Sequence, residues 1–182
     1  MCFPADVLRP LASLTEDLAS ASDVRFGAVI DPELPGVRVP EAALREAVSN
    51  LIDNGLKYCE PTPSGGARLL GLCCRWDEAA QRILILVWNS AAPLPDEELE
   101  AAFQWGARGR AAASDVGGSG YGLLIVRRLV ELMGGTVRLS NAPLPDWLRA
   151  VLPPEVAEER PRPVGVSGCI YLPRNVVAPP PE

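Results

Sequence analysis

The sequence lacks several features that would point to common classes of protein. Its 182 residues include no histidine, no run rich in lysine and arginine, and no apolar stretch of the roughly 18 residues that a membrane-spanning helix needs. A formal net charge of -6 also argues against a nucleic-acid or anionic-membrane surface, because such polyanions require clustered cations. The first residues lack the basic and apolar segments of a secretion signal. Because histidine is absent, any histidine chemistry must use a residue outside this chain.

The five cysteines follow no spacing typical of a metal site, and their number is odd. Cys73 and Cys74 lie in an apolar run, where free thiols behave as small hydrophobic side chains. This pattern favours free thiols over a disulfide framework. We therefore expect the chain to work in a reducing, intracellular compartment.

Length and apolar content (48%) predict a single domain with one core over residues 1–175. Apolar residues at helical spacing predict helices at 6–21, 40–58, 95–103 and 122–133. An alternating pattern predicts a strand at 24–30, and β-like runs predict strands at 68–76, 83–89, 136–140 and 169–172, with the second and third joined as a hairpin. The other expected segments are a loop at 104–118, a proline-rich insertion outside the core at 142–168, and a disordered tail at 176–182.

Two asparagines one helical turn apart stand on an otherwise apolar helix. Asn50 and Asn54 share one face of the helix predicted at 40–58, and Lys57 follows three residues later. Amides in the middle of a helix are poor helix formers, so their presence there favours a role beyond the fold. Capping or simple solvent exposure is the alternative for this pair.

A glycine-dense loop at 117–122, Gly-Gly-Ser-Gly-Tyr-Gly, runs directly into the predicted helix at 122–133. Glycines allow backbone N–H groups to approach an anion, and the positive end of a helix dipole favours a phosphate. Glycine-rich turns are also common before ordinary helices. The loop alone therefore leaves both interpretations open.

Four motifs follow one another in a distinctive order. They are NLIDNGLKY at 50–58, VWNSAAPLP at 87–95, AAFQWGARG at 101–109 and GGSGYGLLIV at 117–126, and a last strand reads GCIYLP. Together they resemble the N, G1, F and G2 boxes of the catalytic, ATP-binding domain of sensor histidine kinases, in the GHKL ATPase superfamily. The resemblance covers residues 6–175. The Asn-Ser-x-x-Pro form of the second motif is weakly similar to cyanobacterial and plastid sensor kinases, which adds the plastid stroma to the cytoplasm as an expected compartment.

The resemblance implies an α+β fold of the Bergerat type, a two-layer α/β sandwich in which three main helices cover a mixed, mainly antiparallel sheet. ATP would lie between the helix at 40–58 and a lid. Asn54 would coordinate Mg²⁺ with help from Asn50, Lys57 would neutralise phosphate charge, and Tyr58 would pack near the nucleotide. The other cofactor-binding residues that it implies are Asn89, Ala91, Arg108, Gly118, Gly120, Tyr121, Gly122 and Leu123.

The motif at 87–95 departs from the family pattern. Asn89 replaces the aspartate that reads adenine, and Ala91 and Pro93 replace two glycines. An amide keeps an acceptor oxygen for the adenine amine but loses the charge, so weaker adenine binding is expected. Ala91 would be costly if its backbone needs a positive φ, and Pro93 removes a donor.

Three functions compete. The resemblance favours the catalytic domain of a two-component sensor kinase, which would transfer the γ-phosphoryl group of ATP to an acceptor on a dimerisation hairpin outside this chain and would act with a response regulator. The alternative is a regulatory pseudokinase or protein-interaction module with weak or lost ATP binding. A hydrolytic ATPase of the same superfamily is disfavoured, because Asn50 stands where those enzymes carry a general-base glutamate, and an amide cannot take a proton from water. Glu46, one turn earlier, is a weak substitute base.

Overall fold

A mixed sheet forms the centre of the molecule. The computed structural model describes residues 1–62, 65–104 and 120–174. Within them, five strands form one sheet in the order β1-β2-β3-β5-β4, with β1 parallel to β2 and the other neighbours antiparallel. The strands are β1 (Val24–Ile30), β2 (Arg68–Asp77), β3 (Arg82–Ser90), β4 (Thr136–Pro143) and β5 (Val164–Pro173).

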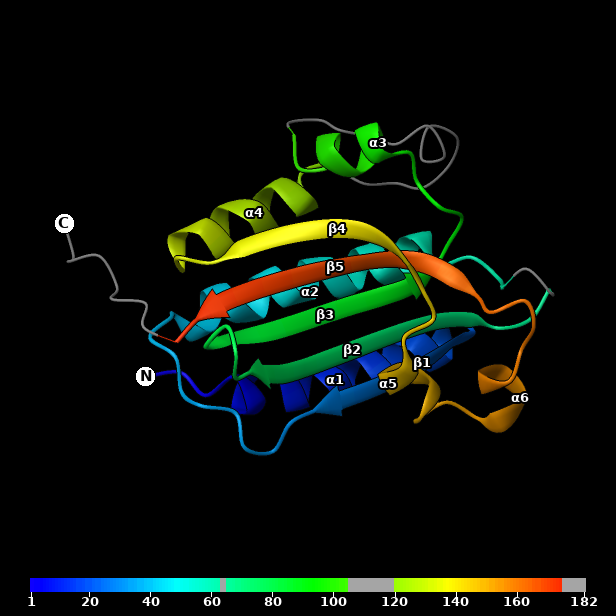
Figure 1. Ribbon diagram of the computed structural model, residues 1–182, viewed down its shortest axis with the longest axis horizontal. Helices are drawn as coiled ribbons and strands as arrows, with labels where there is room; N and C mark the ends of the chain where they lie inside the picture. Colours follow the sequence, from blue (N-terminus) through cyan, green and yellow to red (C-terminus); the bar gives the residue numbers. More distant parts are fainter. Residues whose placement is uncertain (63–64, 105–119, 175–182) are drawn as a thin grey trace.

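Three long helices cover one face of this sheet (Figure 1). They are α1 (Pro4–Ala21), α2 (Glu41–Tyr58) and α4 (Gly122–Leu132), and a short α3 (Asp96–Ala101) contacts β4. α2 follows Pro40, carries Glu41 in its first turn and Lys57 in its last, as the helix dipole favours. The expected helices and strands are all present, and the α+β sandwich with three main helices is confirmed.

Side-chain alternation along the central strands separates two hydrophobic clusters. On β2, Leu70 and Leu72 join the main core under the helices, while Leu69 faces the other side of the sheet. On β3, Ile85 joins the main core and Trp88 faces the other side. Both faces of the central strands are therefore buried, which explains why the sequence shows nearly continuous apolar runs there.

The segment at 142–168 is not the insertion outside the core that the sequence predicted. Its ends extend β4 to Pro143 and begin β5 at Val164, and between them α5 (Asp146–Arg149) and α6 (Pro154–Ala157) lie on the sheet face opposite the long helices (Figure 1). A second hydrophobic cluster joins this segment to the sheet through Leu69, Trp88, Leu144, Leu148, Leu152 and Val156. Prolines divide the segment into single helical turns, so its buried positions show no sustained period.

All five cysteines are buried and free. Burial raises the pKa of the Cys73 thiol to about 11, so this side chain stays protonated and unreactive near neutral pH. No helix in the described parts of the chain is long and apolar enough to cross a membrane. The tail expected at 176–182 and most of the loop expected at 104–118 lie outside the described residues.

Leu148 provides a direct test of the second cluster. Its side chain is fully buried, and it fills the space left by Gly71, where a Cβ atom would lie 2.6 Å from Leu148 Cδ2. Leu148→Ala should lower the free energy of unfolding by about 2–5 kcal/mol, measured by urea denaturation. Leu132→Ala, at a leucine that is 69% exposed, is the control and should change it by less than about 0.5 kcal/mol. Equal effects of the two substitutions would contradict a structural role for the segment.

Candidate functional site

The two asparagines of α2 lie against the start of α4. Asn50 donates from Nδ2 to the backbone oxygen of Glu46 at 2.9 Å and to its carboxylate at 3.1 Å, which leaves Oδ1 on the other side of the amide. A Cβ atom at Gly122 would lie 3.3 Å from Asn50 Oδ1 and 3.5 Å from Asn54 Nδ2. The absence of a side chain at position 122 therefore keeps a small space open above both amides.

Asn54 carries an unsatisfied polar group. Its Nδ2 atom is buried and has no hydrogen-bond partner within the described residues. An unpaired buried amide costs about 1–3 kcal/mol, so its presence calls for a cause other than stability. Asn54 is also neither fully exposed nor at the end of α2, which removes the capping and solvent-exposure explanations. The Nδ2 group of Asn54 can donate a hydrogen bond to a bound acceptor such as a phosphate oxygen.

The first turn of α4 adds positive potential to this space. Gly120 adopts a left-handed backbone with φ of 72°, which turns the chain into the helix that begins at Gly122. The residue at the N-cap position of α4, Tyr121, makes no capping hydrogen bond with its side chain. Unpaired N–H groups and the helix dipole favour an anion here, and the asparagine amides lie beside them. The combination suits a phosphate chain and a cation bound to it.

Asn89 stands at the end of β3, close to the last turn of α2. It is 8% exposed, and Nδ2 makes long hydrogen bonds to the backbone oxygens of Tyr58 at 3.5 Å and Ser90 at 3.4 Å. Two carbonyl neighbours require a donor at that position, so Oδ1 is the atom left to accept from a ligand. An aspartate would place a carboxylate oxygen against both carbonyls. The amide at position 89 is thus adapted to its surroundings.

Ala91 does not carry the backbone cost that the sequence raised. Among the described non-glycine residues, positive φ occurs at Asp23 and Gln81, not at Ala91. The backbone N–H of Ala91 points to the oxygen of Val164 at 3.4 Å. The loss of glycine at position 91 therefore requires no strained conformation.

The remaining predicted site residues are divided between the surface, the core and the undescribed part of the chain. Lys57 and Tyr58 are exposed at the end of α2, and Tyr121 is exposed just before α4. Leu123 packs against the main hydrophobic core, so its side chain holds the start of α4 on that core. Arg108 and Gly118 lie outside the described residues.

Sequence reasoning missed Glu60 and Asn141. The side chains of both bind the backbone of the segment that follows Asn89. Neither belongs to a recognisable motif, and both are exposed polar residues that the fold brings together. No signal in a single sequence would have identified them.

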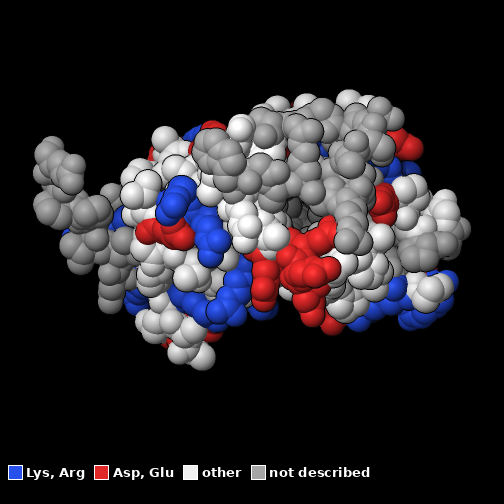
Figure 2. All heavy atoms as spheres, turned by 90° about the horizontal axis from the view of Figure 1, so that it is seen from above, with Lys and Arg blue, Asp and Glu red and all other residues white. Residues whose placement is uncertain are grey.

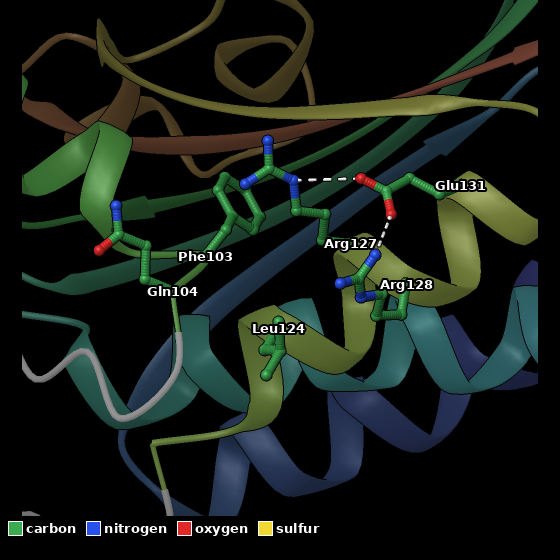
Figure 3. Close-up of a pocket in the computed structure, with 6 residues that line it drawn as sticks. All are labelled: Phe103, Gln104, Leu124, Arg127, Arg128 and Glu131. Carbon is green, nitrogen blue, oxygen red and sulfur yellow. Dashed lines mark hydrogen bonds and ion pairs between the residues drawn. The ribbon is translucent and has the colours of Figure 1, made fainter.

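A second hollow lies between the end of α3 and the outer side of α4 (Figure 3). Arg127 stacks over the Phe103 ring at 5.6 Å, and Glu131 binds Arg127 at 3.3 Å and Arg128 at 3.1 Å. The single carboxylate of Glu131 offsets only one of the two guanidinium charges, so one net positive charge remains at this hollow. Figure 2 shows acidic side chains gathered over the neighbouring α3, which lower the attraction of an anion to this side.

The residues that form α2, β3 and α4 lie within a stretch of the chain that matches a known family. The family model described as "Histidine kinase-, DNA gyrase B-, and HSP90-like ATPase" matches residues 40–161. This chain belongs to that ATPase family. Its relatives make it an ATP-binding catalytic domain of the sensor histidine kinase type.

Curated relatives and solved structures agree with this assignment. Sensor histidine kinase Hik2 of Thermosynechococcus vestitus is 34% identical over 137 residues, which are 75% of this chain and 34% of that protein. The adaptive-response sensory kinase SasA of Synechococcus sp. (strain CC9311) is 30% identical over 128 residues, 70% of this chain and 32% of that one. The chain thus spans about a third of the length of these relatives.

The mycobacterial sensor histidine kinase MprB has the same fold, with a TM-score of 0.71, 22% identity, and coverage of 97% of this chain and 99% of that chain. The catalytic domain of histidine kinase ThkA follows with a TM-score of 0.67, 20% identity, and coverage of 93% and 91%. Both likenesses concern the fold.

Gly122 tests the space above the asparagines. Gly122→Ala places a methyl group 3.3 Å from Asn50 Oδ1, and alanine is the better helix former by about 0.5–1 kcal/mol. We expect the free energy of unfolding to stay constant or rise while ATP affinity, measured by calorimetry, falls about tenfold or more. Arg128→Ala, at an exposed position of the same helix, is the control that should leave both unchanged. Unchanged ATP affinity in Gly122→Ala would place the ligand elsewhere.

Proposed function

We propose that this chain binds Mg²⁺-ATP between the asparagine face of α2 and the start of α4, and that it transfers the γ-phosphoryl group to a histidine on a helical hairpin outside this chain. The buried, unpaired amide of Asn54 beside Asn50 and Gly122 is the observation that carries the proposal. It is a polar group whose cost is explained by a ligand.

The donor set fits Mg²⁺. This ion takes oxygen ligands, usually one or two from protein together with water and phosphate oxygens. Asn54 would provide Oδ1 to the ion, while its unpaired Nδ2 would donate to a phosphate oxygen. Asn50, whose Nδ2 is held by Glu46, would assist through the same shell of ligands. When bound, the ion would neutralise the charge of the phosphates.

The residues of this chain would mainly bind and orient the nucleotide. Asn89 would accept a hydrogen bond from the exocyclic amine of the base, since its Nδ2 faces two carbonyls. The first turn of α4 would hold phosphate oxygens through backbone N–H groups. Lys57 and Tyr58, exposed at the end of α2, would contact phosphate charge and the base. Positioning and electrostatics are what phosphoryl transfer mainly requires of a protein.

Transfer to a protein acceptor fits this site better than hydrolysis. Asn50 cannot act as a general base, and the Glu46 carboxylate already accepts the Asn50 amide at 3.1 Å. No described side chain is thus poised to activate water beside Asn54. A phosphoryl group would therefore pass to a nucleophile that docks from outside.

α4 offers a surface for such docking. Tyr121, Ile125 and Leu132 are exposed on it at roughly helical spacing. Histidine kinase ThkA has also been solved in complex with its response regulator TrrA. The match to that structure has a TM-score of 0.61 and 19% identity, and it covers 93% of this chain and 40% of the matched chain. These observations support a helical phosphoacceptor hairpin and a response regulator as partners.

The buried free thiols support a reducing compartment. The cytoplasm is proposed as the location, with the plastid stroma as the alternative.

Asn54→Ala tests the proposed magnesium ligand. The substitution removes an unpaired buried amide and improves helix propensity, so folding stability should stay constant or rise. Mg²⁺-dependent ATP binding should be lost in calorimetry, and the parent kinase should lose transfer of labelled γ-phosphate to its histidine. Asp53→Ala, the adjacent exposed residue of α2, is the matched control and should retain both.

Three outcomes would contradict the proposal. Unchanged Mg²⁺-ATP affinity in Asn54→Ala would remove this residue from the site. Release of inorganic phosphate without a phosphorylated histidine in the wild-type parent would instead identify a hydrolytic ATPase, and absence of ATP binding in the wild type would favour an interaction module.

A further inference from the structure

Residues 91–95, the base-edge segment, connect the end of β3 with α3. One residue, Ser90, separates them from Asn89, whose oxygen is the proposed acceptor for the base. The segment contains Pro93 and Pro95 and no glycine, so two of its residues have no N–H to donate. Its position therefore depends on contacts made by neighbouring elements.

Glu60 holds the first half of this segment. Its carboxylate accepts the backbone N–H of Ala92 at 2.9 Å. Glu60 is itself fixed to the end of β3, because its N–H donates to Ser90 O at 2.8 Å and the Ser90 hydroxyl donates to Glu60 O at 2.6 Å. Glu60 lies two residues after α2, so it ties the helix of the asparagine pair to the base-edge segment.

Asn141 holds the second half. It lies near the end of β4, and its amide makes two hydrogen bonds to one residue. Oδ1 accepts the N–H of Leu94 at 2.9 Å, and Nδ2 donates to the backbone oxygen of Leu94 at 2.7 Å. This pairing fixes both the place and the orientation of the peptide groups around Leu94, as a strand partner would.

We propose that Glu60 and Asn141 are positioning residues for the nucleotide base. They hold the base-edge segment beside Asn89 in a chain that lacks the glycines of the family motif, and they thereby set the affinity for the base. This inference rests on the proposed function, because it requires that a nucleotide binds at Asn89. Neither residue is among the proposed ligands of the phosphates or of Mg²⁺.

The test measures ATP dissociation constants by NMR titration, which extends into the millimolar range. Asn141→Ala should weaken ATP binding about tenfold, as expected for the loss of two hydrogen bonds that fix the site. Glu60→Ala should weaken it by a smaller factor, and Glu60→Gln, which keeps an acceptor oxygen for Ala92, should restore the wild-type value. Ser140→Ala, at the exposed neighbour on β4, is the matched control and should have no effect.

A double-mutant cycle separates positioning of the base from a general structural role. If Asn141 affects ATP binding only by positioning the base at Asn89, then Asn141→Ala should change the ATP dissociation constant little in an Asn89→Leu background. The contact between Asn89 and the base is already lost there. Additive losses in the cycle, or wild-type affinity in Asn141→Ala, would overturn this inference and leave the proposed function intact. Absence of ATP binding by the wild type would overturn the proposed function and this inference together.

Discussion

The close approach of α2 to the sheet at Gly55 is the constraint on which the site depends. A Cβ atom there would lie 2.5 Å from Leu70 Cδ1, inside the main core, and 3.7 Å from the Cβ atom of Asn89. A larger residue would have to displace the buried Leu70 side chain or move the helix away from β2 and β3. Because α2 lies this close, Asn54 on the helix and Asn89 on the strand can border one nucleotide site, as proposed above. The packing of Gly55 against the sheet therefore sets the position of Asn54, proposed for the phosphates, relative to Asn89, proposed for the base.

The structure separates stability from function between the two faces of the sheet. The face under α1, α2 and α4 carries the asparagines, and there the chain tolerates the unpaired amide of Asn54. The opposite face is covered by the segment with α5 and α6, where Leu148 and Trp88 are fully buried. This additional core supplies stabilisation away from the ligand. A site with a destabilising polar group can therefore persist in a well-packed domain.

Much of the fold was predictable because its elements have strong periods. Asn50, Asn54 and Gly122 lie in compact motifs, so the sequence could name them as candidates, and the structure brings them together. The part that the segment at 142–168 takes in the second hydrophobic cluster was not predictable, because its buried residues lie on single helical turns between prolines. The hydrogen bond from the Asn89 amide to the backbone oxygen of Tyr58 was not predictable either. Only the packing of α2 against the sheet brings that oxygen close to Asn89. Contacts between exposed residues far apart in the chain, such as Asn141 with Leu94, leave no local pattern at all.

The most direct measurement of the central claim is an NMR titration of the isotope-labelled chain with Mg²⁺-ATP that maps the shifted amide signals. The account predicts the largest shifts at Asn50, Asn54 and Asn89 and in the first turn of α4 at Gly122. Shifts confined to the hollow between α3 and α4, at Phe103 and Arg127, would contradict it, as would a spectrum that does not change.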